Sequence, residues 1–343
     1  MSLQVRSVRL GPVSFRARPR TWLVAALAWG AALAGAIAVL FSGAVNMTPE
    51  QFWAALAGVG ERADMLLLWE FRMPRAVTGL VVGACLGTAG CLFQALSRNA
   101  LGSPEIIGLT GGAALGAVAS VIVFRSFGWG TAVGAIIGCL GAALLTWVLS
   151  PRGFGGGNRL ILIGLGVASL IQPVTVLLLT RADSDSATSA RLWLTGTLNA
   201  RNWSHAAVGT VLFAVILPFA LLISRHLDAA APGEDLAAGL GVSRRFTQWT
   251  ATGVGVALTA AAVAVAGPIS FIALAGPHVT RRLLKGPTAP AGIAAGTGAA
   301  LLVAADLVGA NLPGGLQLPV GVTAGLLGGA YLLLLLNGQE RKK

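Results

Sequence analysis

The sequence predicts an all-α membrane protein with ten transmembrane helices and both termini in the cytoplasm. Of its 343 residues, 55% are hydrophobic and 10% are charged, whereas a soluble domain carries about 25% charged residues. A helix that crosses the hydrocarbon layer needs roughly 20 apolar residues, and the chain contains many unbroken runs of this length. The composition excludes a disordered chain and a collagen, and the long runs argue against the alternating pattern of a membrane barrel.

Nine stretches are clearly long and apolar enough to span a membrane. They are approximately 21–41, 76–96, 105–124, 128–149, 159–180, 203–224, 246–265, 289–309 and 319–336. Arginines are frequent in residues 1–20, which predicts a cytoplasmic N-terminus. A secretory signal is the competing reading, but the first apolar run is longer than the 7–15 residues of a signal's hydrophobic region.

A tenth crossing follows from the positions of the later basic clusters. Basic residues cluster at 225–245, 281–285 and 341–343. All three clusters lie on the cytoplasmic side of the membrane when the region between the first two crosses it twice. The pair Gly267-Pro268 breaks that region, because proline cannot continue a helix there. We therefore expect a short crossing at 268–280.

The same layout divides the chain into three parts. Residues 1–20 form a cytoplasmic N-terminal segment, residues 21–336 a ten-helix transmembrane domain, and residues 337–343 a cytoplasmic basic tail. The net charge of +12 is explained by this orientation of the helices and does not indicate nucleic-acid binding.

Small residues are frequent in the spans and predict close helix packing. Glycines four residues apart let helix backbones approach; such pairs occur at Gly83/Gly87, Gly112/Gly116, Gly134/Gly138, Gly292/Gly296 and Gly321/Gly325. The cysteines Cys85, Cys91 and Cys139 lie in apolar runs and are interpreted as small packing residues.

Catalytic motifs are missing from the sequence. It contains no GxxxxGK[ST] loop, no HExxH, no CxxC and no GxSxG. We expect no ATP hydrolysis, no metal site and no bound cofactor in this chain, which disfavours a membrane-embedded enzyme.

Asp306 is the clear acidic residue within the spans. A carboxylate there costs about 2.5–3.5 kcal/mol on insertion scales, so it is a functional candidate. Nothing basic lies beside it in sequence, which favours a structural role, snorkelling outward or capping a neighbouring helix, over a proton relay. An ion-coupled secondary transporter would carry more such groups.

Several motifs, in order along the chain, resemble one family. They are Arg72-Met-Pro-Arg75, the segment Gln94-Ala-Leu-Ser-Arg98-Asn99-Ala-Leu-Gly-Ser-Pro104-Glu-Ile-Ile-Gly108, Gly233-Glu234, Gly267-Pro-Ile-Ser-Phe-Ile-Ala-Leu-Ala-Gly-Pro-His278 and Ala305-Asp306. They resemble the FecCD family, the membrane subunits of ABC importers for ferric siderophores, haem and vitamin B12. The resemblance covers about residues 40–340 and implies ten helices with cytoplasmic ends, in agreement with the charge pattern.

The resemblance also implies partners and a cargo. It implies a location in the cytoplasmic (inner) membrane, a second permease subunit, two copies of an ATPase subunit that uses ATP and Mg, and an extracytoplasmic binding protein. We expect a ferric siderophore of the catecholate type and a homologous, non-identical second permease. The alternatives are a homodimeric permease for vitamin B12 or haem, and an ion-coupled carrier that works alone.

Two arginines are candidates for docking the binding protein. The resemblance implies this role for Arg72 and Arg75, which we expect just outside the second helix; the alternative is anchoring at the membrane interface. Arginine suits the role because its planar fork binds carboxylates at two points. Some relatives have a third docking arginine where this chain has Asn311.

The 225–245 loop is the candidate ATPase-coupling element. Pro232-Gly233 breaks the chain, and acidic residues follow at the start of a short helix. The resemblance assigns coupling to Gly233, Glu234, Leu240 and Gly241, against the alternative of an ordinary surface helix.

The loops 97–104 and 150–158 resemble the cytoplasmic gate of the family. The candidates are Asn99, Leu101, Gly157 and Asn158, with an ordinary turn as the alternative. Ala100 replaces the usual proline, and Gly155-Gly-Gly157 loosens the second loop. His278 and Pro277 are expected to follow the short eighth helix as a kink and cap.

Overall fold

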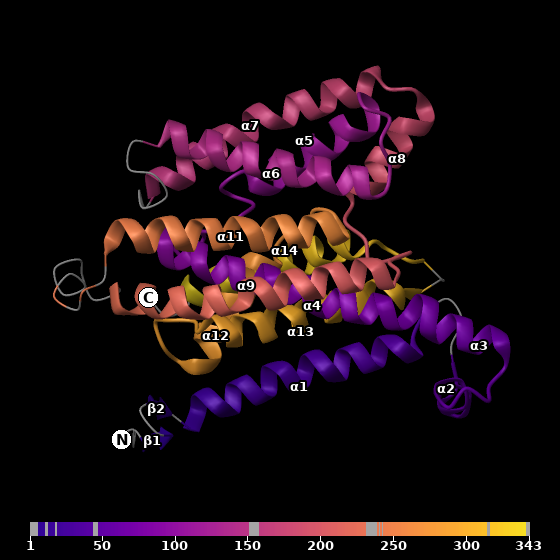
Figure 1. The fold of residues 1–343 in the computed structure, drawn as a ribbon, viewed down its shortest axis with the longest axis horizontal. Helices are drawn as coiled ribbons and strands as arrows, with labels where there is room; N and C mark the ends of the chain where they lie inside the picture. The colour runs from indigo at the N-terminus through magenta and orange to yellow at the C-terminus, as the bar shows by residue number, and fades with distance from the viewer. Residues whose placement is uncertain are drawn as a thin grey trace.

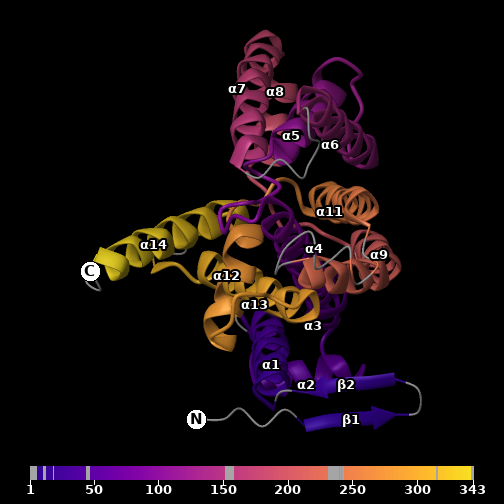
Figure 2. The ribbon, with the colours of Figure 1, turned by 90° about the vertical axis from the view of Figure 1, so that its left-hand side faces the viewer.

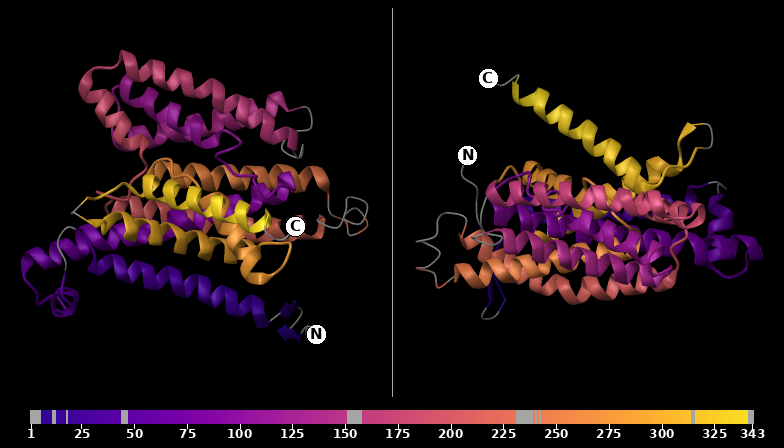
Figure 3. Two further views of the ribbon diagram at one scale, coloured as in Figure 1. Left: turned by 180° about the vertical axis from the view of Figure 1, so that it is seen from behind. Right: turned by 90° about the horizontal axis from the view of Figure 1, so that it is seen from above.

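The computed structural model describes residues 6–10, 13–17, 19–43, 47–150, 158–230, 239, 241, 243–313 and 316–340. Its long helices run roughly side by side in two layers (Figure 1). Helices α5 to α8 form one layer, and α1, α4, α9, α11, α12 and α13 form the other. Helix α14 (Val320–Glu340) slants away from both layers (Figures 2 and 3).

Helix α4 (Met73–Ser97) is the centre of the larger layer. It packs against α9 (Trp203–Ala230), α11 (Arg244–Ala266), α12 (Ile272–Leu284) and α13 (Ala291–Ala310). In the most apolar stretch of each span, 83% is buried for the span that includes α4 and 22% for α9. Helix α1 (Pro19–Phe41) lies on the outer side of α13.

The smaller layer contains α5 (Leu109–Ile122), α6 (Trp129–Leu149), α7 (Asn158–Arg181) and α8 (Ser184–Leu194). Gly112 and Gly116 of α5 face Gly138 and Gly134 of α6 so closely that a Cβ would collide with the opposite backbone. Gly83 and Gly87 of α4 meet the backbone of α13 in the same way. The expected close packing is therefore confirmed for these pairs, whereas Gly325 faces no neighbour within 4 Å.

A helix is present at each of the ten expected positions. Seven are long and apolar enough to cross a membrane, and α5 and part of α14 are shorter apolar helices. The protein is therefore a multi-pass helical membrane protein. The full count of ten crossings, which needs α5, α12 and α14 to cross, and the cytoplasmic position of both termini remain predictions.

The structure adds elements that we did not expect. The N-terminal segment contains a hairpin of β1 (Arg6–Leu10) and β2 (Val13–Ala17), paired antiparallel. Helices α2 (Pro49–Leu56) and α3 (Arg62–Leu66) follow α1. A capping box at Thr48 and Gln51 begins α2.

The second transmembrane helix begins earlier than expected. A π-helical turn, η1 (Leu67–Arg72), joins α3 directly to α4, so Arg72 and Arg75 lie within a continuous helix and not outside it. Pro74 lacks an N–H, and its ring clashes with the carbonyl one turn earlier in a regular α-helix. We infer that the wider π turn accommodates this proline.

The break at Gly267-Pro268 is confirmed, with Gly267 at φ +81°. The expectation for Pro277 and His278 is wrong, because α12 continues through both to Leu284. Pro277 donates no hydrogen bond to the carbonyl of Ala273 one turn earlier, and Gly90 of α4 packs directly against that carbonyl. His278 lies edge-on to the ring of Tyr331, with 5.9 Å between centroids.

Candidate functional site at the two ends of the bundle

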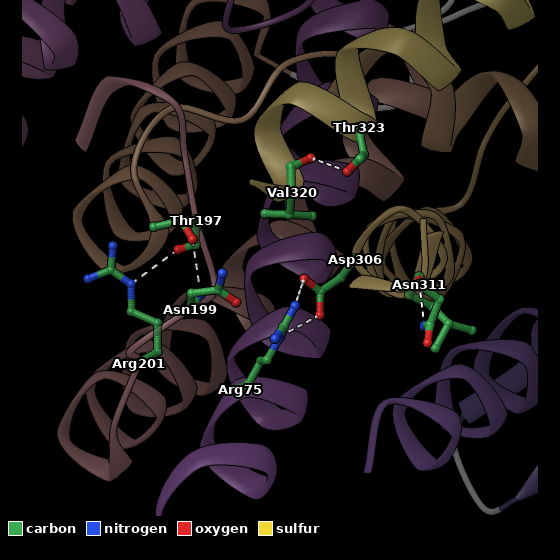
Figure 4. A network of polar contacts seen from close by, with 9 residues as sticks. Arg75, Thr197, Asn199, Arg201, Asp306, Asn311, Val320 and Thr323 are labelled. Carbon is green, nitrogen blue, oxygen red and sulfur yellow. Dashed lines mark hydrogen bonds and ion pairs between the residues drawn. The ribbon is translucent and has the colours of Figure 1, made fainter. Parts of the chain in front are cut away.

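An ion pair joins α4 to α13 at the end where α4 begins, here called the outer end. Both oxygens of Asp306 accept hydrogen bonds from Arg75, each at 2.8 Å (Figure 4). The Asp306 side chain is 4% exposed and the Arg75 side chain 19%. Asp306 thus neither snorkels outward nor caps a helix; its charge is neutralised by a residue distant in sequence.

Arg72, the other expected docking residue, and Asn311, which stands where some relatives have an arginine, also make hydrogen bonds at the outer end. Arg72 is 6% exposed and donates to the carbonyl oxygen of Leu40. The side chain of Asn311 donates to the carbonyl of Leu307 at 2.7 Å and so closes the end of α13. These contacts do not test docking, which remains a prediction for Arg72 and Arg75.

The segment Thr195–Arg201 crosses the outer end between the two layers. Thr197 N–H donates to Ala266 at the end of α11 at 2.9 Å, and Gly321 N–H of α14 donates to Gly196 at 3.0 Å. The Arg201 guanidinium donates to the Thr197 carbonyl at 3.2 Å (Figure 4). Burial lowers the pKa of Arg201. The segment therefore ties the break after α11 to the start of α14.

Sequence reasoning assigned no role to this segment. Gly196, at φ +64°, is the residue that could have indicated a turn there, because glycine adopts a positive φ readily. Beside the segment, the His205 ring stacks on Trp129 with 4.8 Å between centroids.

At the opposite, inner end, polar contacts hold α12 against α4. The Gln94 amide donates to the Leu274 carbonyl at 3.0 Å. The Phe271 N–H donates to the Glu105 carboxylate at 3.3 Å, which ties the α4–α5 connection to the start of α12. These contacts fix α12 although it has only 13 residues.

The predicted gate is only partly described. The side-chain oxygen of Asn99 accepts from the Leu101 N–H at 2.9 Å, a turn that asparagine favours, and the Leu101 side chain is exposed. Asn158 is the first residue of α7, and Gly157 lies outside the described residues. Gating by these residues remains a prediction.

The predicted coupling loop at 225–245 is longer than the connection in the structure, because residues 225–230 belong to α9 and residues 244–245 to α11. Gly233, Glu234 and Leu240 lie outside the described residues. Gly241 is exposed and has φ +75°, which favours glycine. Coupling by these four residues remains a prediction.

Within the described residues, no group of three or more His, Cys, Asp or Glu side chains could hold a metal ion. The three cysteines are buried and unpaired by disulfides.

Comparison with known proteins identifies the class. The chain matches the FecCD transport family over residues 31–337 and belongs to this family. It is 40% identical over 306 residues to the ferric enterobactin transport system permease protein FepG of Escherichia coli (strain K12), covering 89% of this chain and 92% of the relative. It is 31% identical over 305 residues to the iron(3+)-hydroxamate import system permease protein FhuG of Bacillus subtilis (strain 168), covering 86% and 90%.

The fold agrees with this assignment. A solved metal-chelate type ABC transporter, in an inward-facing conformation, superposes with a TM-score of 0.79. It is 26% identical in sequence, and the match covers 91% of this chain and 99% of the other.

Proposed function

We propose that this chain is the membrane-spanning permease subunit of an ATP-driven importer that carries a ferric siderophore across the cytoplasmic membrane. The observation that carries the proposal is the 40% identity with a ferric enterobactin permease over 89% of this chain. The apolar spans, the absence of a phosphate-binding loop from the sequence and the likeness to a metal-chelate transporter support it.

The partners follow from that role. The chain works with a homologous second permease, two ATPase subunits and an extracytoplasmic binding protein. ATP and Mg belong to the ATPase subunits, and this chain binds no cofactor of its own. Arg72 and Arg75 contribute to docking the binding protein, the 225–245 loop transmits movement from the ATPase, and the turn at Asn99 and Leu101 belongs to the inner gate.

The cargo is a ferric catecholate. Identity is higher to the ferric enterobactin permease, at 40%, than to the hydroxamate permease, at 31%, or the iron dicitrate permease of Escherichia coli, at 35%. A pathway of small residues with few fixed charges passes a large anionic complex without holding it tightly.

The test is uptake by cells that lack this gene. Four radiolabelled cargos are compared: ferric enterobactin, a ferric hydroxamate, ferric citrate and vitamin B12. We expect selective loss of ferric enterobactin uptake, restored by the wild-type gene. Loss of another cargo with enterobactin uptake intact contradicts the catecholate assignment, and uptake that persists without the ATPase contradicts the importer assignment.

A further inference from the structure

The connection between α4 and α5 is anchored in the smaller layer. The hydroxyl of Thr146 on α6 donates to the Ile107 carbonyl at 3.2 Å, and Ile107 is fully buried. Gly164 of α7 packs so closely against Ile107 that a Cβ on this glycine would collide with the Ile107 backbone. Glu105 lies two residues earlier and is half-buried. Its backbone is therefore held in place by contacts with α6 and α7.

The Glu105 carboxylate contacts α12 where that helix begins. It accepts a hydrogen bond at 3.3 Å from the N–H of Phe271, the residue that precedes the first turn of α12. This N–H group has no acceptor within its own helix, and the helix dipole is positive at this end, so a carboxylate stabilises it. The start of α12 lies within the depth of the bundle, because the Ala273 carbonyl packs against Gly90, seven residues before the end of α4. A backbone N–H at membrane depth needs an acceptor from the protein, and Glu105 supplies it.

Phe271 is held in a strained backbone conformation. Its φ is +69°, in the left-handed region that side chains with a Cβ rarely adopt. Such residues persist where the surrounding structure fixes them, and they are frequent in regions that switch between conformations. A hydrogen bond to a charged carboxylate is stronger than one between neutral groups, so it opposes this strain. Without the carboxylate, we expect Phe271 to relax toward a negative φ and its ring to move.

The Phe271 ring supports α14. Gly328 of α14 lies so close to this ring that a Cβ on the glycine would collide with it. Gly325 on the same helix differs, because no described atom lies within 4 Å of a Cβ there. One turn after Gly328, the Tyr331 ring lies edge-on to His278 of α12. This part of α14 therefore rests on α12, and Phe271 makes the closest approach.

The start of α14 is held separately. The Gly321 N–H donates to the Gly196 carbonyl at 3.0 Å, and the first turns of α14 pack against α13. Two supports fix the direction of a helix, and Gly321 and Gly328 lie about 10 Å apart along the axis. The helix that they hold slants away from both layers (Figures 2 and 3). A displacement at Gly328 grows along the helix, by a factor of about 1.7 at Leu333.

We propose that Glu105 and Phe271 form a joint that sets the tilt of α14. Glu105 keeps Phe271 in the left-handed conformation, and the Phe271 ring keeps α14 at its slant. A movement of the α4–α5 connection reaches α14 through this hydrogen bond and this ring. Glu105 is thus a positioning residue that acts on α14 through Phe271. The same connection carries the turn at Asn99 and Leu101, so in the importer the joint relates the predicted inner gate to α14; this last step rests on the proposed function.

The test measures the tilt of α14 in the full chain, assembled with its partner subunits in lipid nanodiscs. Spin labels are attached at Leu333→Cys on α14 and at Leu27→Cys on α1, and pulsed electron paramagnetic resonance gives the distance between them. Both leucine side chains are exposed, and the three native cysteines of the chain are buried. Helix α1 is the reference because it packs against α13, which also holds the start of α14.

The first matched pair is Gly328→Ala and Gly325→Ala. The methyl group at 328 must move away from the Phe271 ring by roughly 1 Å to reach an ordinary carbon–carbon distance. We therefore expect Gly328→Ala to change the mean distance between the labels by up to about 2 Å, and Gly325→Ala to leave it unchanged. Adding Phe271→Ala to Gly328→Ala removes the collision and should bring the distance back toward the wild-type value.

The second set of variants tests the carboxylate. Glu105→Ala removes the acceptor and should broaden the distribution of distances, because Phe271 is no longer held. Glu105→Gln keeps an acceptor oxygen, so its distribution should lie closer to that of the wild type. Glu50→Ala, which changes an exposed acid on α2, should have no effect. If Glu105→Ala does not assemble, Glu105→Asp replaces it, since the shorter side chain withdraws the carboxylate from the Phe271 N–H and should also broaden the distribution.

Equal distances for Gly328→Ala and Gly325→Ala overturn the proposal, because the ring is then not a support of α14. A double variant that keeps the distance of Gly328→Ala also overturns it. So does a wild-type distribution in Glu105→Ala, or in Glu105→Asp where that variant is used. The measurement needs no cargo, so its outcome is independent of which cargo the importer carries.

Discussion

Arg75 and Asp306 are 231 residues apart in sequence, yet they form a two-point ion pair that joins the first turn of α4 to the last turns of α13. The pair closes the outer end of the two most intimately packed helices of the larger layer. The Arg75 guanidinium offsets part of the cost of burying a carboxylate that is only 4% exposed.

Asp306→Asn should therefore destabilise the protein strongly. The change leaves the largely buried Arg75 without a counter-charge, and we expect a loss of roughly 3 kcal/mol. Thermal unfolding of the purified complex measures it, with the exposed Asp185→Asn as control. The double variant Arg75→Gln with Asp306→Asn should recover part of the loss; if it is the least stable of the set, the ion pair is not the cause.

Charge reversal at Arg72 and Arg75 should weaken docking of the binding protein. Replacing both by Glu puts negative charge where acidic residues of the partner are expected, and the loss should be larger at low salt, where charges are least screened. Because the change at Arg75 also removes the partner of Asp306, docking is compared only after thermal unfolding shows that the variant is folded. Surface-bound permease and titrated binding protein give the affinity. Arg62→Glu is the control, since Arg62 is an exposed arginine of the same end; equal docking by both variants means that Arg72 and Arg75 are structural residues.

Gly241→Ala should reduce transport per ATP hydrolysed. The residue has φ +75°, a conformation that costs alanine about 1–2 kcal/mol, so the change strains the end of the predicted coupling element just before α11. Gly239→Ala is a close control because Gly239 also has open space around a Cβ but lacks the positive φ. Transport and ATPase activity in proteoliposomes are compared, and equal ratios for the two variants contradict the prediction.

Acid should weaken the outer end of the smaller layer through Asp183. The Ser186 backbone and side chain donate hydrogen bonds to this N-cap carboxylate, and together with nearby Arg125 they hold the pKa of Asp183 below its usual value. A lowered folded pKa means that the stabilisation is complete above the unfolded value of about 3.9 and is lost as pH falls through the folded value.

Asp183→Asn keeps a capping oxygen but cannot titrate, so unfolding temperature should depend less on pH in this acid range. Asp185→Asn, two residues later and exposed, should leave the acid dependence unchanged. Matching profiles for the wild type and Asp183→Asn would remove Asp183 as the cause.

The positions of the ten helices could be predicted because each is an apolar run bounded by charges or by Gly and Pro. The break at Gly267 was predictable for the same reason. The continuation of α12 through Pro277 was not, because it depends on α4 packing against the carbonyl that this proline leaves free. The residues of α12 alone do not indicate which helix packs against it.

The polar contacts between helices could not be predicted from the sequence either. Asp306 has no basic neighbour along the chain, and its partner lies on a helix seven spans earlier in the predicted order. The start of α2, in contrast, could have been predicted from the sequence, since Thr48-Pro-Glu-Gln51 combines a capping box with proline in the first turn.

The α5–α8 layer is joined to the rest of the chain by two strands of backbone, residues 98–108 toward the inner end and residues 195–202 at the outer end (Figure 1). Between these two connections the layers touch through side chains: the Trp147 ring of α6 lies 5.1 Å from the Trp249 ring of α11, and Trp129 of α6 stacks on His205 of α9. A movement of one layer against the other would therefore have to separate these rings, while the segment from Gly196 to Arg201 and the turn after Ser97 keep the layers joined.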